Sequence, residues 1–196
     1  MLRPRRFAQM LRPGPPSPTL ESLRPGDHPE FFRLAPPEGA SRESTIALDR
    51  EGHFFHDGVK VEHPGLARAM HTWIRRHPDD GRFILSNGYD WVYIAVEDAP
   101  FFVRRVDPEG GAIWLELSDG TREPWDPAHS RVGQGGALYA PVKASSEGGP
   151  FAAKFTRHAQ LSLAPLLLER GDKVAVELGG RSIVIGEGAE GPPADA

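Results

Sequence analysis

The sequence contains no cysteine. Disulfide bonds, a thiolate nucleophile and cysteine-ligated zinc or iron–sulfur clusters are therefore excluded. The chain also has no apolar run near the ~20 residues that a membrane-spanning helix needs. Its net charge of −4 lacks the basic excess of a general nucleic-acid-binding protein. From these absences we expect a cytoplasmic protein with no membrane span and no DNA or RNA partner.

Proline, glycine and arginine are abundant in residues 1–42, where the apolar residues follow no regular period. This composition predicts a disordered N-terminal arm, with Phe31 and Phe32 docking on the core. Two other interpretations of the arginine-rich start remain open, an organellar targeting segment and a partner-binding arm. The prolines oppose the amphipathic helix of a targeting segment. The tail 187–196 is also predicted to be disordered.

Between these ends lie roughly 145 residues, enough to bury a hydrophobic core without staples. Turn residues separate short β-rich runs, and Asn87-Gly88 is the strongest hairpin signal. A second helix is predicted over Arg157–Leu168, where Pro165 should kink or shorten it. A first helix is predicted to begin at Pro64, because the following apolar residues have helical spacing: Leu66, Met70, Trp73, Ile74 and His77.

The order of the predicted elements is hairpin, helix, hairpin, and then strands, helix, hairpin. This order predicts an α+β protein of two similar small halves, each with an antiparallel sheet and one helix. The N-terminal half is expected to span 43–106 and the C-terminal half 107–186, so that they meet near Asp107.

Two adjacent carboxylates, Glu97 and Asp98, follow a predicted strand at a turn. Neighbouring residues of a strand point to opposite faces, but at a turn both can face outward. Such a pair can bind a metal ion through oxygen or divide acid and base roles. The residues alone favour a simpler interpretation, in which Asp98 caps backbone amides ahead of Pro100.

Three basic residues, Lys154, Arg157 and His158, lie where a predicted strand meets a predicted helix. Free backbone amides and the helix dipole favour an anion at such a junction, and basic side chains add charge-assisted bonds. The alternative is an ordinary solvated basic patch. Trp91 and Tyr139 fit core or hairpin positions, although either can stack on a flat ring if it is exposed.

Other catalytic and cofactor patterns are not found in the sequence. The histidines lack the His-Glu-x-x-His spacing of a zinc site, and the glycine-rich stretches lack the lysine and serine or threonine of a phosphate loop. No serine lies in a Gly-x-Ser-x-Gly elbow. We therefore assign no catalytic residue, no metal ligand and no cofactor.

Three stretches together carry a family resemblance: 48–58 before a predicted helix, 81–85 with Ile94–Phe101, and 149–151 before the second helix. They resemble the bacterial domain-of-unknown-function family numbered twelve-eighty-five. The stretch with Glu97-Asp98-Ala99-Pro100, together with 136–141, is also similar to an uncharacterised mitochondrial protein family that has a Glu-Asp-x-Pro element.

This resemblance covers Thr45–Ile185 and implies a duplicated α+β core whose second half is pleckstrin-homology-like. It also implies a ligand site between the halves, for a nucleotide-like molecule, with a role in signalling. Residues 86–90 depart from the bacterial family's pattern, so this chain is expected to bind a different ligand, or none, if that stretch contacts the ligand.

The leading functional hypothesis is a non-enzymatic binding or regulatory protein with a small anionic, nucleotide-like ligand between its halves. The carboxylates would accept bonds from the ligand, the basic residues would hold its anionic group, and an aromatic residue would form a wall. These ligand-binding residues are Trp91, Glu97, Asp98, Tyr139, Lys154, Arg157 and His158.

Two other classes of function compete with this hypothesis. The first is a protein-interaction module that engages a protein partner through a sheet edge and the N-terminal arm. The second is a hydrolase that uses Glu97 or Asp98 with a histidine, which requires the two side chains within hydrogen-bond reach in a cleft.

Overall fold

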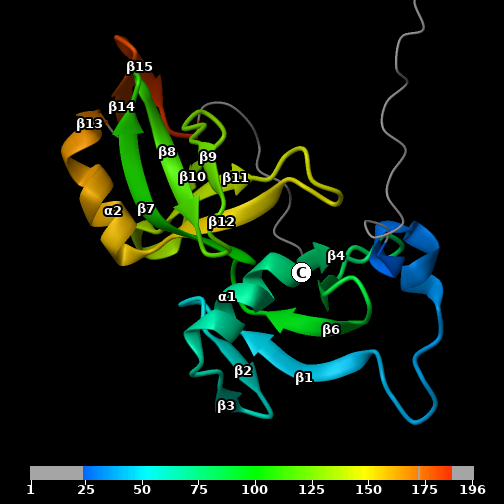
Figure 1. Cartoon of the computed structure of the whole chain (residues 1–196). Helices are drawn as coiled ribbons and strands as arrows, with labels where there is room; N and C mark the ends of the chain where they lie inside the picture. Colours follow the sequence, from blue (N-terminus) through cyan, green and yellow to red (C-terminus); the bar gives the residue numbers. More distant parts are fainter. Residues whose placement is uncertain (1–23, 172, 187–196) are drawn as a thin grey trace, which may run out of the picture.

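The computed structural model describes residues 24–171 and 173–186. Two six-stranded sheets and one three-stranded sheet make up most of this part of the chain, together with two short α-helices (Figure 1). The architecture is α+β with two similar halves, as the order of elements predicts. Residues 1–23 of the predicted arm and the predicted tail 187–196 lie outside the described residues.

The first sheet contains β1 (Glu43–Leu48), β2 (Phe54–His56), β3 (Val59–Lys60), β4 (Ile74–Arg76), β5 (Phe83–Ser86) and β6 (Trp91–Val96). Its strand order is β3-β2-β1-β6-β5-β4. The first and last strands, β1 and β6, are neighbours and run parallel. All other neighbours are antiparallel, as a chain that turns back through short hairpins requires.

The second sheet contains β7 (Phe101–Glu109), β8 (Ala112–Leu117), β9 (Arg122–Pro124), β10 (Arg131–Val132), β11 (Leu138–Val142) and β12 (Phe151–Phe155). Its order is β10-β11-β12-β7-β8-β9, and β12 and β7 run parallel at the centre. The third sheet contains β13 (Leu167–Arg170), β14 (Lys173–Leu178) and β15 (Arg181–Val184).

The two large sheets therefore share one topology: two antiparallel meanders joined by a central parallel pair. The predicted antiparallel pairing is confirmed for all neighbours in these two sheets except this one parallel pair in each half. The chain changes sheet between Val96 and Phe101, and the predicted division at 106/107 lies within β7. The strand continues past Asp107 because its turn comes later, at Gly110 and Gly111, which both have positive φ.

Helix α1 (Pro64–Trp73) begins where the sequence predicts, since the His63 ring accepts a bond from the Leu66 amide at 3.1 Å. It ends at Trp73, and Ile74 begins β4 opposite Leu85. The expectation that the helix runs to His77 is wrong, because the apolar spacing there also fits a strand.

Helix α2 (Arg157–Leu163) begins after Thr156, whose hydroxyl accepts a bond from the Ala159 amide at 3.2 Å. A 3₁₀ turn, η5 (Ala164–Leu166), follows it and contains Pro165. The expected shortening at this proline is confirmed, because proline cannot donate the next helical hydrogen bond. The residues beyond η5 form β13 in place of the predicted last helical turn.

Residues 24–34 form a segment that we call the strap, with two 3₁₀ helices, η2 (Pro25–Asp27) and η3 (Pro29–Arg33). Phe31 and Phe32 in the strap are buried, so the predicted docking of these two residues is confirmed. The prediction of disorder does not hold for the strap. Burying two aromatic rings gives these few residues the apolar contacts that local composition alone does not reveal.

One hydrophobic core connects the halves, since residues of β1, β2 and α1 pack with those of β7, β8 and β12. At the contact, Gly52 of the turn after β1 lies against the Phe102 ring. A Cβ atom there would come within 2.8 Å of the ring, and φ is +86°. Only glycine meets both conditions.

Candidate functional site

A groove runs between α1 and one face of the first sheet. Its volume is about 310 Å³, near the lower end of the ~300–1,000 Å³ typical of ligand pockets. Apolar side chains from three strands, from α1 and from the segment before α1 form most of its walls. They are Ile46 of β1, Val61 before α1, Leu66, Met70 and Trp73 of α1, Leu85 of β5, and Val92 of β6. We call this hollow the α1 groove.

Strand alternation and helix spacing bring these side chains together. Leu85 and Val92 are cross-strand partners, so their side chains lie on the same face of the sheet. Leu66, Met70 and Trp73 recur at i, i+4 and i+7, which places them on one face of α1. The helix and the sheet leave a hollow between these apolar surfaces.

The lining of the groove also includes polar residues. His56 is an exposed member of β2, and Asn87 and Asp90 belong to the turn between β5 and β6. The side-chain oxygen Oδ1 of Asn87 accepts bonds from the backbone amides of Tyr89 and Asp90, both at 2.9 Å, and so holds this turn in shape. The groove thus combines a mainly apolar wall with a few polar groups, as small-molecule sites commonly do.

Asp90 is the charged group of the lining. Its carboxylate accepts a bond from Nη1 of Arg42 at 2.6 Å, and the Arg42 guanidinium lies 4.5 Å from the centre of the Trp91 ring. The side chain of Asp90 nevertheless remains 63% exposed. It is therefore open to a hydrogen-bond donor or a cation from outside the groove.

The opposite face of the same sheet is filled by the strap. Phe31 and Phe32 pack on Ile84, Trp91 and Tyr93 there. This places Trp91 in an aromatic cluster within the N-terminal half. Its ring contacts are with Phe32, His77 and Tyr93 rather than with the predicted junction residues, and it lines the α1 groove at the turn end of β6.

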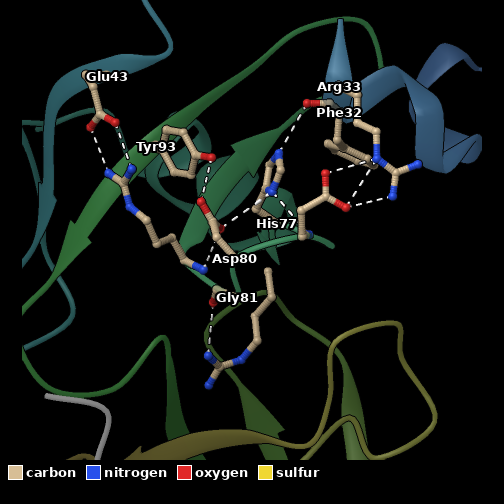
Figure 2. A network of polar contacts seen from close by, with 10 residues as sticks. Phe32, Arg33, Glu43, His77, Asp80, Gly81 and Tyr93 are labelled. Carbon is tan, nitrogen blue, oxygen red and sulfur yellow. Dashed lines mark hydrogen bonds and ion pairs between the residues drawn. The ribbon is translucent and has the colours of Figure 1, made fainter.

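Polar contacts surround this aromatic cluster (Figure 2). The His77 ring contacts the Phe32 carbonyl through Nε2 at 3.1 Å, and its Nδ1 accepts a bond from the Asp79 amide at 3.3 Å. Arg33 holds the Asp79 carboxylate with three bonds, the shortest 2.6 Å. The strap is therefore fixed by both apolar and charged contacts.

Tyr93 donates a bond to the Asp80 carboxylate at 2.8 Å in this network. Burial and this anionic neighbour raise the pKa of Tyr93 to about 12, so its hydroxyl remains protonated. Burial opposes ionisation of Asp80, yet the bond from Tyr93 and the backbone amide of Arg82 keep the pKa of Asp80 below its usual value. Tyr93 therefore stays protonated and Asp80 stays ionised, so the bond between them keeps one direction, as expected of a structural contact.

Three of the predicted site residues meet where the two halves join. Lys154 donates to the Asp98 carboxylate at 2.6 Å, and the Tyr139 hydroxyl donates to both carboxylate oxygens at 3.0 Å. Lys154 also donates to the backbone oxygen of Arg50 at 2.9 Å. Burial, followed by the bond to Asp98, raises the pKa of Tyr139. We call Asp98, Tyr139 and Lys154 the junction cluster.

The pairing register of β11, β12 and β7 explains why the residues of the junction cluster lie together. Tyr139 of β11 and Lys154 of β12 are direct cross-strand partners, and Lys154 is in turn opposite Phe102 of β7. Asp98 lies in the short connection that enters β7. The cluster therefore connects the second sheet with the turn after β1, and the charge of Lys154 is neutralised by Asp98.

The other predicted site residues lie apart from this cluster. Glu97 forms an exposed ion pair with Arg50 at 3.7 Å. Arg157 and His158 are exposed in the first turn of α2, and neither side chain has a hydrogen bond or ion pair among the described residues. No histidine bonds to Glu97 or Asp98 within the described chain, so the arrangement gives the hydrolase hypothesis no support.

A second polar contact between the halves is buried and involves His71 and Ser118. Nδ1 of His71 on α1 lies 3.2 Å from Oγ of Ser118, which also accepts a bond from the Phe102 amide. Burial, and then the charge of Arg104, lowers the pKa of His71 to about 4. Both side chains are almost fully buried, so the pair has no access to a substrate and acts as an internal contact.

The sequence indicates the apolar helix face that forms one wall of the α1 groove, but not the groove itself. The spacing of Leu66, Met70 and Trp73 predicts an apolar helix face, and such a face normally packs completely against the core. What the sequence does not show is that the helix leaves a hollow, since this depends on the distance between α1 and the sheet. The charged residue types of the sequence give no indication of this hollow, because its walls are mainly apolar.

Two further properties concern metals and membranes. Over residues 24–171 and 173–186, no group of three or more histidine, aspartate or glutamate side chains is placed to hold a metal ion. In the same ranges, no helix combines the length and the apolar character needed to cross a membrane.

Comparison with protein-family models and with curated proteins finds no match. Two solved structures share the fold. The DUF1285 family protein from Silicibacter pomeroyi DSS-3 has a TM-score of 0.57 at 18% sequence identity, covering 79% of this chain and 91% of that chain. The DUF1285 family protein from Shewanella baltica OS155 has a TM-score of 0.51 at 16% identity, covering 64% and 94%.

These identities are low, so the comparison concerns architecture and assigns no ligand or activity. The structural neighbours confirm the predicted resemblance to the bacterial family, while the resemblance to the mitochondrial family stays a prediction. The chain has the α+β fold, with two similar halves, of DUF1285 family proteins, a family of unknown function.

Proposed function

We propose that this protein is a ligand-binding protein whose site is the α1 groove. The observation that carries the proposal is the apolar hollow of about 310 Å³ next to Leu66, a side chain that is 44% exposed. A folded protein normally covers such surface, and an apolar pocket with a few polar groups is the usual form of a binding site.

The chemistry of the lining defines the class of ligand. The apolar part would enter the space between Leu85, Val92 and α1, and a hydrogen-bonding or cationic end would face Asp90. Burial of about 200 Å² of apolar surface contributes roughly 5 kcal/mol. Micromolar affinity requires about 8 kcal/mol, so the polar end must contribute as well.

A matched pair of substitutions tests the site. Leu66 and Leu161 are both exposed leucines on helices, but only Leu66 lines the groove. Leu66→Lys should weaken binding of the neutral apolar dye Nile red at least ~10-fold, which corresponds to about 1.4 kcal/mol. Leu161→Lys should leave the affinity unchanged. Fluorescence titration of the full chain measures both, and equal weakening by both substitutions would refute the proposal.

The junction cluster provides a second candidate site, for the small anionic or nucleotide-like ligand that the family resemblance implies. Arg131 of β10 stacks on the Tyr139 ring at 4.1 Å and has no carboxylate partner among the described residues. Register places Arg131, Tyr139 and Lys154 in one row across three strands. An anion there would bind Arg131 and compete with Asp98 for Lys154.

This second site is the weaker candidate, because Lys154 already has a carboxylate partner at 2.6 Å. If it binds nucleotides, millimolar nucleotide should raise the melting temperature of the full chain, and Arg131→Ala should remove most of that shift. A signalling role would rest on such binding. No shift with any nucleotide would leave the α1 groove as the site.

A further inference from the structure

The described chain starts at the edge of the α1 groove. The Gly26 amide donates to the Gly88 carbonyl at 2.9 Å, and Gly88 lies in the turn whose residues Asn87 and Asp90 line the groove. A Cβ atom on Gly26 would come within 2.8 Å of the Gly88 Cα atom, so the strap and this turn are in close contact. The residues that precede Arg24 are therefore attached beside the groove.

The length of this preceding segment is sufficient to cover the groove. At ~3.3–3.6 Å per residue, the roughly 13 residues from Leu11 to Arg24 can span up to about 45 Å. Helix α1 has 10 residues and is therefore about 15 Å long. Residues 2–12 can thus reach any part of the groove without displacing the strap.

The composition of residues 2–12 matches the groove. Their apolar members are Leu2, Phe7, Ala8, Met10 and Leu11, and their charged members are all arginine: Arg3, Arg5, Arg6 and Arg12. A cavity of about 150 Å³ is enough for a benzene ring. A groove of about 310 Å³ therefore has room for the Phe7 ring and one aliphatic side chain.

Acidic side chains at the border of the groove could form ion pairs with these arginines. Asp57 and Glu62 are exposed and directly follow the lining residues His56 and Val61. Among the described residues, Asp57 lies 3.7 Å from the His56 ring and accepts a bond from the Thr45 hydroxyl, but no lysine or arginine pairs with Asp57 or with Glu62. Arginine side chains would complement both carboxylates.

We propose that residues 2–12 of this chain occupy the α1 groove and compete with its ligand. This inference rests on the proposed function, because it gives that site an internal competitor. If the segment fills the groove about 90% of the time, the apparent affinity of an external ligand falls about tenfold.

Contact between the segment and the groove can be measured directly in the full chain. The chain has three methionines, two in residues 1–23 and Met70 in the groove, so methyl signals are easily assigned. Because there is no cysteine, Gln9→Cys introduces a single site for a spin label. We expect this label to broaden the Met70 methyl signal, whereas a label at Ser182→Cys on β15 should not.

A mixing experiment identifies the occupant. Spin-labelled protein without ¹³C is mixed with ¹³C-methionine protein without a label. Broadening of Met70 only in this mixture would mean that a second copy supplies the segment, which overturns the proposal in its intramolecular form. An unbroadened Met70 signal in both samples would overturn it altogether.

Affinity gives an independent measurement. The triple variant Phe7→Ser, Met10→Ser, Leu11→Ser should bind Nile red about tenfold more tightly than the natural chain, and the control Leu20→Ser should not. Unchanged affinity of the triple variant would overturn the inference. The effect of Leu66→Lys would still decide separately whether the groove is a binding site, so the two failures are distinguishable.

Discussion

The two faces of the first sheet have the same kind of side chains but different covers. On one face, the strap inserts Phe31 and Phe32 against Ile84 and Trp91, and all four side chains are buried. On the other face, α1 packs over Leu85 and Val92 but leaves a hollow of about 310 Å³. The same strands thus support one closed surface and one incomplete surface.

This difference separates close packing from open space within one sheet. The strap face contributes aromatic packing, the His77 contact and the Arg33–Asp79 pair, which together fix the N-terminal segment. The groove face keeps apolar surface uncovered, which reduces the gain from burial but leaves room for a ligand. Substitutions on the strap face should therefore mainly lower the free energy of unfolding, whereas substitutions on the groove face should mainly change ligand binding.

The largest effect is expected on the strap face. Phe32→Ala should lower the free energy of unfolding by about 3–5 kcal/mol, because the ring is almost fully buried and its removal leaves a cavity. Leu34→Ala should change it by less than ~0.5 kcal/mol, because that side chain is exposed. Urea unfolding measures both. Similar small losses for the two variants would show that the strap is not an integral part of the fold.

Two buried histidines, His77 beside the strap and His71 on α1, allow a second test. His77 has partners on both ring nitrogens, whereas Nε2 of His71 has none among the described residues. His71 has a folded-state pKa of about 4, below its ordinary value of 6.5, so the folded protein favours its neutral form. The unfolded chain binds the proton more tightly, and stability should fall as the pH is lowered from 6.5 to 4.

The size of this loss follows from the difference in pKa and is about 3 kcal/mol across the window. His71→Gln cannot take up a proton, so the slope of unfolding free energy against pH between 4 and 6.5 should become shallower. Urea titrations at several pH values measure the slope. An identical slope in the variant would mean that other groups account for the acid sensitivity.

Added volume should separate the two faces clearly. Ile84→Phe lies under the strap at a fully buried position and should cost about 1–3 kcal/mol through overpacking. Val92→Phe points into the groove, where added atoms find space, and should be neutral or stabilise by up to about 1 kcal/mol. It should also block Nile red. Equal destabilisation by the two would contradict the difference between the faces.

Local signals in the sequence were sufficient for most of the elements. Asn87-Gly88 predicted the β5–β6 hairpin, Pro64 the start of α1, and Pro165 the shortening of α2, because each fixes its own backbone. Helical spacing alone misplaced the end of α1. The pairing of Ile74 with Leu85 on β5 decides that end, and such pairing is a tertiary contact.

The candidate site was harder to predict for the same reason. Asp98, Tyr139 and Lys154 do meet, but they satisfy one another across the junction, which their residue types alone do not reveal. Trp91 is buried under the strap, and this depends on where Phe31 and Phe32 dock. The α1 groove depends on the separation between a helix and a sheet, a distance that no residue pattern specifies.

The smallest effect is expected at the exposed edge of the strap. Arg33 forms three bonds with Asp79, but both side chains are about half exposed, so solvent screens the pair and it should contribute little to the free energy of unfolding. Arg33→Met keeps most of the stem and removes the charge. We expect only a small loss of unfolding free energy, and one that shrinks in high salt, because salt screens exposed charges. Urea unfolding at low and high salt measures it. A loss as large as that of Phe32→Ala would mean that the charged pair, rather than the aromatic packing, holds the strap and closes this face of the sheet.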